Sequence, residues 1–329
     1  MQSRLSTIGL AATLTIITSA SCTTLQHTQE SAPASASPSD ALPNENGFSG
    51  LAQVDDSAFL AVHDELIYED GSRLTLIRME TGMAPTFSPV RVDDWMDPSG
   101  PSSDLESICA VPSRFGHFLL AEAGYWESQY GRLFHIELDA QEESAKVLGV
   151  AQLPLILDND PNQDGDQFEG LECTHAGDDS ILLVLGERGG SDSYRSGRLR
   201  WGTLDLTNHS LTFTSQGKQG VELNAPGQWS DASTNRDISA LYVDPEGTLW
   251  AAAAEDPGDL GPFHSVIYKV GVFRADPENP IQINQTIDVW KEVPGFKIEA
   301  LSGPLAAVAG STLSFGTEDE LYGGVLRFL

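Results

Sequence analysis

An internal repeat limits what this chain can fold into more than any other feature of its sequence. In each of five copies a short apolar strand opens with a Gly, Ser or Ala beside an acidic or polar residue, and a second apolar strand ends at a glutamate about sixteen residues later. The copies run from Ser49-Gly50-Leu51 to Glu65, from Glu106-Ser107-Ile108 to Glu122, from Glu169-Gly170-Leu171 to Glu187, from Ser239-Ala240-Leu241 to Glu255 and from Glu299-Ala300-Leu301 to Glu318. A spacing of 57 to 70 residues between equivalent apolar positions indicates stacked or radially arranged units.

Each copy continues with further strands. Third strands are predicted at Leu74–Ile77, Leu133–Ile136, Leu199–Leu206, Val266–Val270 and Val325–Phe328, and fourth strands at Val90–Val92, Lys146–Val150, Leu211–Phe213 and Ile281–Ile283. Turn residues separate these strands, and no segment has the apolar periodicity of an amphipathic helix of twelve or more residues. Four short strands per copy favour an all-β fold, and specifically a β-propeller whose blades bury their faces against one another.

The number of blades follows from the number of copies. Five copies predict five blades, with six as the alternative if a long connection hides a degenerate copy, and a β-sandwich is the competing all-β fold. The fifth copy stops after its third strand, at Leu329. A strand borrowed from the other terminus would close the ring, and only the Pro- and Asn-rich residues just before Gly47 are available for it.

The first 46 residues differ from the rest of the chain. Arg4 precedes an apolar run that ends in small residues, which predicts a secretory signal peptide at residues 1–21. Residues 22–46 are rich in Ser, Ala and Pro and predict a disordered linker, so we expect the folded domain at 47–329. The small residues before Cys22 also resemble a bacterial lipoprotein box. A lipid anchor on Cys22 and a free secreted product therefore remain alternatives, and both place the protein outside the cytoplasm, either secreted, periplasmic or membrane-anchored.

The charge of the chain restricts its partners. Asp and Glu number 48 against 18 Lys and Arg, which gives a formal net charge of −30. A field of this sign repels phosphate backbones and anionic lipid headgroups, so it argues against nucleic-acid and membrane-surface binding. We expect a monomer that binds a small-molecule ester or an envelope ligand, and that contacts the membrane only through an anchor at Cys22.

The repeated acidic residues are the candidate functional side chains. The innermost strands of a propeller line a central channel, so equivalent positions converge there, and convergent polar groups in a concavity are the default site hypothesis. The candidate catalytic residues are Glu106, Glu169, Glu187, Arg188, Glu255 and Glu299. The alternative for each carboxylate is a structural one, in which it caps a strand end and accepts backbone hydrogen bonds. His63 is a further candidate, as a general base.

An acidic loop predicts a calcium site. The segment from Asp158 to Glu169 has oxygen-bearing side chains at the ligand spacing of an EF-hand loop. The candidate metal ligands are Asp158, Asp160, Asp164, Asp166 and Glu169. Gln163 replaces the glycine that such loops require, and the flanking segments look like strands. A calcium site of different geometry and a solvated acidic turn both remain open.

Two further features are each open to two interpretations. A basic island could orient an anionic ester or could pair with neighbouring acids, and it consists of Arg188, Arg195, Arg198 and Arg200. Cys109 and Cys173 lie in the first strands of successive copies and could form a disulfide. Their positions relative to the repeat differ by one residue, and alternate residues of a strand point to opposite faces, so we expect two buried free thiols instead.

Several of these motifs also indicate a family. The segments Asp104–Ile108, Phe168–Glu172, Leu185–Gly190 and Ile298–Leu301 resemble the phytase-like β-propeller family, named for the esterase-like activity of phytase. The similarity spans residues 47–329 and implies an extracytoplasmic propeller that hydrolyses phosphate or carboxylic esters with calcium. The acidic motif runs of alkaline β-propeller phytases are not found in this sequence.

Two hypotheses about function follow. In the first, calcium held by the channel carboxylates polarises an ester oxygen while water attacks, and Arg188 stabilises the negative charge. In the second, the propeller is a non-catalytic module that binds a ligand or protein of the cell envelope, and calcium is structural.

Overall fold

The computed structural model describes residues 42–44, 47–64, 72–98, 100–124, 131–153, 167–190, 194–230 and 233–329. The predicted signal peptide, most of the predicted linker and the lipidation candidate Cys22 lie outside these residues. So do four of the predicted metal ligands, Asp158, Asp160, Asp164 and Asp166. These predictions therefore stay predictions.

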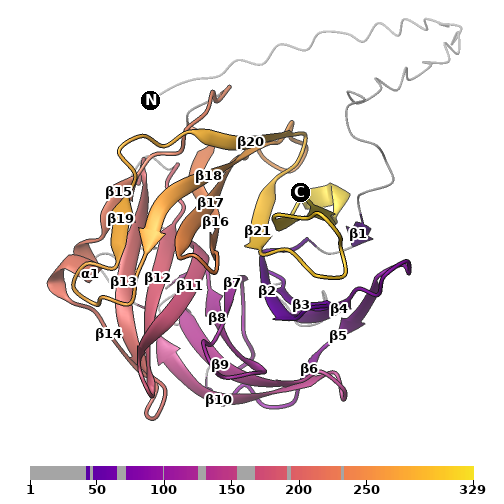
Figure 1. Cartoon of the computed structure of the whole chain (residues 1–329), viewed down its shortest axis with the longest axis vertical. Helices are drawn as coiled ribbons and strands as arrows, with labels where there is room; N and C mark the ends of the chain where they lie inside the picture. The colour runs from indigo at the N-terminus through magenta and orange to yellow at the C-terminus, as the bar shows by residue number, and fades with distance from the viewer. Residues whose placement is uncertain are drawn as a thin grey trace, which may run out of the picture. The chain divides into compact units, whose positions relative to one another are not determined.

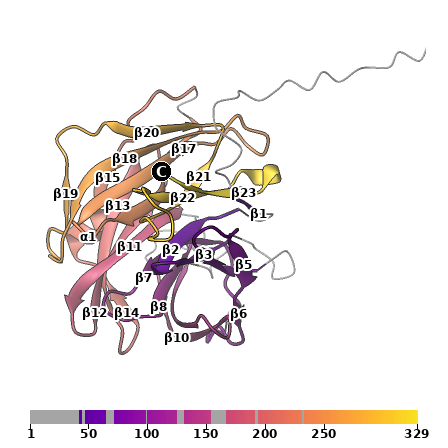
Figure 2. The same ribbon diagram turned by 45° about the vertical axis from the view of Figure 1, so that its right-hand side comes forward.

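The strands form five sheets around a common centre, and each sheet is one blade (Figures 1 and 2). The innermost strands are β2 (Gly50–Asp55), β7 (Leu105–Ala110), β11 (Phe168–Gly177), β16 (Asn235–Val243) and β21 (Ile298–Ser302). The second strands are β3 (Ala58–Val62), β8 (His117–Glu122), β12 (Ser180–Glu187), β17 (Thr248–Glu255) and β22 (Ser314–Thr317). The third strands are β4 (Leu74–Arg78), β9 (Arg132–Asp139), β13 (Gly197–Asp205), β18 (His264–Phe273) and β23 (Gly324–Phe328).

The outer strands complete the blades. They are β5 (Thr86–Pro89), β6 (Arg91–Val92), β10 (Ser144–Gln152), β14 (Ser210–Thr212), β15 (Val221–Leu223), β19 (Ile281–Ile283) and β20 (Val289–Pro294). Helix is limited in the described residues to α1 (Ser215–Gln219) and the 3-10 turn η2 (Glu320–Tyr322). The chain is therefore an all-β, five-bladed propeller, which confirms the predicted fold and excludes the six-bladed and sandwich alternatives.

The two ends of the domain meet in the fifth blade. Strand β1 (Leu42–Asn44) pairs antiparallel with β23, and Leu42 lies opposite Leu326. The Pro- and Asn-rich residues before Gly47 thus supply the missing outer strand. The sheets consequently begin before residue 47, where the composition predicts the folded part to start.

One predicted strand belongs to a different blade. Val90–Val92 was expected as the fourth strand of blade 1, but β5 takes that place and β6 pairs in parallel with β10 of blade 2. Val90 and Val92 are both buried in the apolar layer between blades 1 and 2. Their hydrophobicity therefore reflects packing between blades rather than the edge of blade 1.

Five apolar clusters fill the five interfaces between neighbouring blades. Close approach of the inner strands requires a small side chain at one position of each repeat. At Gly170 a Cβ atom would lie 2.5 Å from the Cγ of Leu241 on the next inner strand, which is too close for any side chain. The small residue that opens each sequence repeat is thus explained by packing near the axis.

A disulfide joins Cys109 and Cys173, with their Cα atoms 6.2 Å apart, so the expectation of free thiols is wrong. The argument from alternating strand faces fails because neighbouring blades pack face to face. Ile108 faces blade 1 while Cys109 faces blade 3, and both Leu171 and Cys173 face blade 2. Residues that meet across such an interface must come from opposite faces of their own sheets, so a one-residue offset favours pairing.

No helix among the described residues has the length and apolar character needed to cross a membrane.

Candidate functional site

One position of the repeat forms a ring around the propeller axis. This axial ring consists of Ser49, Glu106, Glu169, Ser239 and Glu299. Each member follows a fully buried apolar anchor: Phe48, Leu105, Phe168, Ile238 and Ile298. In blades 2, 3 and 5 the pairing with the second strand shifts register at the glutamate. A bulge of this kind re-aims a side chain, and bulges are frequent next to active sites.

The structure brings the three predicted ring glutamates together. Glu106, Glu169 and Glu299 are all at most 8% exposed. Burial raises the pKa of Glu106 well above its usual range, and the negative charges of Glu169 and its acidic neighbours raise that pKa further. Burial likewise raises the pKa of Glu299, although Lys297 opposes the shift. The expectation that acids from distant repeats meet at the axis is therefore correct for these three residues.

Asp104 lies beside the ring, two residues before Glu106. Burial raises the pKa of Asp104 to about 7, and the negative charges of Glu169 and Asp64 contribute to the rise. The backbone of Asp104 has a φ of 60°, a left-handed conformation that Asp and Asn tolerate better than most residues. A carboxyl group held in this way, with a pKa near neutrality, is typical of functional sites.

Two arginines contact the ring from blades 3 and 4. Arg188 Nη1 donates a hydrogen bond to Glu169 Oε1 at 3.3 Å. Arg236 Nη1 lies 3.9 Å from the same oxygen and 3.5 Å from Glu299 Oε1, while its Nη2 lies 2.5 Å from Asp256 Oδ2. Arg236 therefore links the carboxylates of three different blades.

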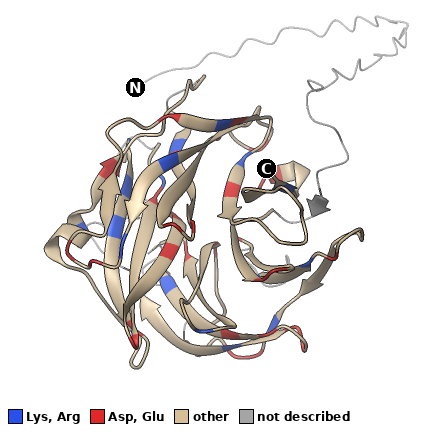
Figure 3. Cartoon of the chain, in the orientation of Figure 1, with Lys and Arg blue, Asp and Glu red and all other residues tan. Residues whose placement is uncertain are grey.

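Lys297 adds a second cation on the side of blade 5. Its Nζ lies 3.0 Å from Glu299 Oε1, 2.9 Å from Glu318 Oε2 and 3.5 Å from Asp256 Oδ2. Burial opposes ionisation of Asp256, but the charges of Arg236 and Lys297 outweigh it and hold the pKa of Asp256 below its usual value. Acidic and basic residues follow each other closely at the start of β21 (Figure 3).

These groups form one electrostatic unit, here called the axial cluster. It consists of Asp64, Asp104, Glu106, Glu169, Arg188, Arg236, Asp256, Lys297 and Glu299. Its composition is graded around the axis. Near blades 1 and 2, other carboxyl groups are the main electrostatic neighbours of Asp104 and Glu106, whereas ion pairs predominate near blades 4 and 5.

The glutamates at the ends of the second strands have a different environment. Glu187 accepts a hydrogen bond from Arg200 Nε, and Glu255 accepts one from Ser230 Oγ. The same arrangement is clearest at Glu122, which accepts bonds from Arg132 Nε at 3.0 Å and from the backbone N–H of Ser103 at 2.9 Å. These contacts match the structural alternative, so we place Glu187 and Glu255 outside the axial cluster.

The remaining candidate residues also divide into one that lies in the axial cluster and others that lie outside it. Arg188 lies in the cluster, whereas Arg198 and Arg200 bond to residues of blade 3. His63 is buried, with Nδ1 2.5 Å from the carbonyl oxygen of Gly47 and Nε2 2.8 Å from Thr75 Oγ1. Burial lowers the pKa of His63 to about 4. With both ring nitrogens engaged in these contacts, His63 is a poor candidate for a general base.

Sequence reasoning missed Arg236 and Lys297. Lys297 occupies the repeat position of Asp104, immediately before the apolar anchor, so the repeat alignment contains the signal for it. Arg236 lies two residues before its anchor, inside the longest register shift of the inner strands, between Arg236 and Ala240. That irregular stretch obscures its equivalence to the other copies.

The carboxylates of the cluster do not suit calcium. Among the described residues, no three His, Cys, Asp or Glu side chains converge in a way that could hold a metal ion. Glu169 and Glu299 already contact guanidinium or ammonium groups, which compete with a cation for the same oxygens. The predicted loop from Asp158 remains untested, because its other four ligands lie outside the described residues.

The axis itself has little free space. The narrow cavity bordered by Glu169, Glu299 and the neighbouring strand residues has a volume of about 10 Å³. That is room for roughly one water molecule.

Comparison with known proteins identifies a fold and no more. No protein-family model and no curated protein matches the sequence. A thermostable family-43 glycoside hydrolase is similar in structure, with a TM-score of 0.50 and 8% identity over 87% of this chain and 91% of the other. A protein of the GH130 family of mannoside phosphorylases and glycoside hydrolases has a TM-score of 0.49 and 12% identity over 87% and 84%. The WD40 β-propeller domain of Doa1 has a TM-score of 0.40 and 11% identity over 88% and 95%. The phytase-like resemblance stays a prediction, and the chain is a five-bladed β-propeller.

Proposed function

We propose that the axial cluster is a hydrolytic site that acts on anionic esters, either phosphate or carboxylic. The main support is that buried carboxyl groups of different blades meet arginines in one place. One of them, Asp104, has a pKa raised to about 7, whereas Asp256 has a pKa below its usual value. Carboxyl groups whose environments separate their pKa values in this way are suited to acid–base work near neutral pH.

Each group has a distinct role in this proposal. Ionised Asp104 takes a proton from the attacking water, and the protonated form later returns it to the leaving oxygen. Arg188 and Arg236 orient the anionic part of the substrate and stabilise the charge that develops on the ester oxygen. No step requires a metal. The glycoside hydrolases among the structural neighbours share only the fold, so the substrate class rests on the site alone.

Asp104→Asn is the test of this role. Asn removes the titrating group but tolerates the left-handed backbone at this position. On p-nitrophenyl phosphate and mono-p-nitrophenyl succinate, which both carry an anionic group, we expect kcat to fall at least about 100-fold, with an unchanged or higher Tm. The wild-type rate should rise with pH through about 7 as Asp104 ionises.

Asp288→Asn is the matched control, since Asp288 is exposed on the connection before β20. It should leave the rate and the Tm unchanged. Equal activity of Asp104→Asn and wild type would contradict the assignment of Asp104. Absence of turnover on every ester, with and without calcium, would contradict hydrolysis as a whole.

A second candidate function is a non-catalytic binding module of the cell envelope. The observation in its favour is the small axial space, because a cluster this enclosed could serve only to hold the blades together. In that case ring variants would change the Tm, and no ester would be turned over.

Export of the protein and calcium binding are two further parts of the proposal, and each is tested separately from the hydrolytic site. The disulfide between Cys109 and Cys173 supports an oxidising compartment outside the cytoplasm, as a secreted, periplasmic or anchored protein. Calcium would bind at the predicted loop, through Asp158, Asp160, Asp164 and Asp166, and Glu169 is the one loop ligand that also belongs to the axial ring. Mass spectrometry of the secreted protein for acylated Cys22, and metal analysis after calcium dialysis, test these two elements.

A further inference from the structure

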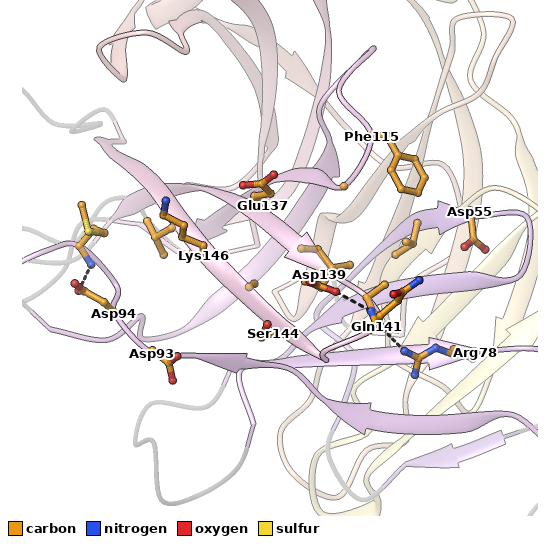
Figure 4. Close-up of a pocket in the computed structure, with 17 residues that line it drawn as sticks. Asp55, Arg78, Asp93, Asp94, Phe115, Glu137, Asp139, Gln141, Ser144 and Lys146 are labelled. Carbon is orange, nitrogen blue, oxygen red and sulfur yellow. Dashed lines mark hydrogen bonds between the residues drawn. The ribbon is translucent and has the colours of Figure 1, made fainter.

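A second, larger cavity lies far from the axial cluster. It has a volume of about 1000 Å³ and is lined by residues of blades 1 and 2 (Figure 4). Asp55 at the end of β2 and the turn Phe115–Gly116 between β7 and β8 both border it. These residues are at the opposite ends of the inner strands from Glu106, so this blade 1–2 cavity opens at the other end of the propeller. Its volume is at the upper end of the range for ligand sites.

Apolar side chains form part of the cavity wall. Phe115 is 84% exposed and Met96 is 58% exposed, although both are large apolar residues. Val54, Leu138 and Val147 also line the cavity. Phe and Met are enriched at protein–protein interfaces, and apolar residues gathered around a hollow indicate a binding surface.

The charged side chains of the cavity are mostly acidic. They are Asp55, Asp93, Asp94, Glu137 and Asp139, against Arg78 and Lys146. Arg78 Nη1 already donates a hydrogen bond to Glu143 Oε1 at 2.8 Å, so its charge is largely compensated. The lining thus presents an excess of negative charge in a chain whose formal net charge is −30.

Several of these carboxylates are held in fixed positions by their own turns. Asp55 Oδ1 accepts a hydrogen bond from the Ser57 N–H at 2.7 Å, and Asp94 Oδ1 accepts one from the Met96 N–H at 2.8 Å. Figure 4 shows Asp55 and Phe115 on one side of the cavity and Asp94 on the other. A ligand that spans the cavity would therefore meet negative charge at both sides, with Phe115 on the same side as Asp55.

We propose that the blade 1–2 cavity binds a basic, amphipathic peptide segment of a partner protein. Lysine or arginine side chains of the segment pair with the acidic lining, while its apolar side chains pack on Phe115 and Met96. The sign of the charge excludes acidic peptides, and it also disfavours anionic lipid surfaces. Because the cavity is separate from the axial cluster, this inference does not depend on the proposed hydrolysis.

The test uses a fluorescein-labelled hexapeptide of alternating lysine and leucine, with binding followed by fluorescence anisotropy. A matched hexapeptide of alternating glutamate and leucine is the charge control. We expect the lysine peptide to bind at least about tenfold more tightly than the glutamate peptide, and to lose affinity as salt increases. Phe115→Ser and Glu137→Lys should each weaken binding of the lysine peptide at least about tenfold.

Matched variants outside the cavity separate a specific site from general charge attraction. Leu260→Ser removes an apolar residue that is 70% exposed in blade 4, and Glu292→Lys makes the same charge change on β20. Both should bind like the wild type, and so should Asp104→Asn. Equal weakening by Glu292→Lys and Glu137→Lys would overturn the proposal. Binding of octylammonium as tight as that of the peptide would assign a small cation instead and would also overturn it.

Discussion

Two sets of glutamates recur in the blades, and they differ in what surrounds them. At the end of β8, Glu122 is fully buried and accepts hydrogen bonds from Arg132 and from three backbone N–H groups. On the axial ring, Glu106 is also buried, but other carboxyl groups are its main electrostatic neighbours. In the first arrangement a guanidinium and backbone N–H groups of one blade surround the carboxyl group, whereas the second raises the pKa of Glu106. Recurrence in a repeat therefore locates an acid in space, and the neighbouring charges decide what it does.

The largest expected effect separates the two sets by stability. Glu122→Gln removes the closest countercharge of the Arg132 guanidinium, which is 2% exposed, although Asp97 still lies 3.4 Å away. Breaking a buried ion pair in this way costs about 3–5 kcal/mol of unfolding free energy. Glu106→Gln removes a group that resists ionisation and should cost less than about 1 kcal/mol, or stabilise the protein. Urea unfolding of both variants measures the difference in unfolding free energy. Equal losses in the two variants would contradict the distinction between the two sets of glutamates.

A smaller effect is expected inside the axial cluster itself. Lys297→Met removes the ammonium group that neutralises Glu299, Glu318 and Asp256. We expect a loss of about 2 kcal/mol, less than for Glu122→Gln because Arg236 still contacts Glu299 and Asp256. The double variant Lys297→Met/Glu299→Gln should recover part of this loss. A double variant that is no more stable than the single one would show that the two groups are not coupled.

The smallest expected effect is on the pH dependence of stability. The raised pKa of Asp104 keeps it protonated in the folded state up to pH about 7, whereas the unfolded chain releases this proton near the ordinary Asp pKa of 3.8. The folded state holds more protons between these two values, so the contribution of Asp104 to stability falls as pH rises through this window. Asp104→Asn should remove this fall.

Differential scanning fluorimetry between pH 4 and pH 8 checks this prediction, with Asp288→Asn as the reference. The Tm difference between Asp104→Asn and wild type should grow with pH by roughly 2 °C or more, which corresponds to about 1 kcal/mol. His63 and His135, whose pKa values burial lowers to about 4, act in the opposite direction. Their contribution cancels in the difference between variant and wild type. A constant difference would show that Asp104 ionises normally in the folded protein.

The sequence predicted the blades well because each inner strand has a local signature. An apolar anchor such as Phe168, an acidic or hydroxyl residue such as Glu169 and a small residue such as Gly170 occur in that order, and each has a packing reason. The convergence of Glu106, Glu169 and Glu299 followed from that alignment alone. The sequence showed only that residues before Gly47 could supply a closing strand. It did not predict β1 itself, because a strand of three residues is too short to show a hydrophobic periodicity.

The rest of the site depended on contacts between blades, which a single sequence does not display. Nothing in the spacing shows that Arg236 of blade 4 reaches Glu169 of blade 3 and Glu299 of blade 5. The choice between a catalytic and a structural role for Glu187 stayed open for a related reason. Its partner Arg200 is thirteen residues away in sequence but directly accessible across the hairpin. Hairpin partners of this kind could be sought from the register of β12 and β13.

The pairing of Leu42 with Leu326 has a consequence for the order in which the chain acquires its structure. In a polypeptide that is synthesised or translocated N-terminus first, β1 can pair only after β23 has emerged. Until then the outer edge of β23 is unpaired, and exposed sheet edges can pair with strands of other chains. Deletion of Leu42–Asn44 should therefore favour aggregation over assembly.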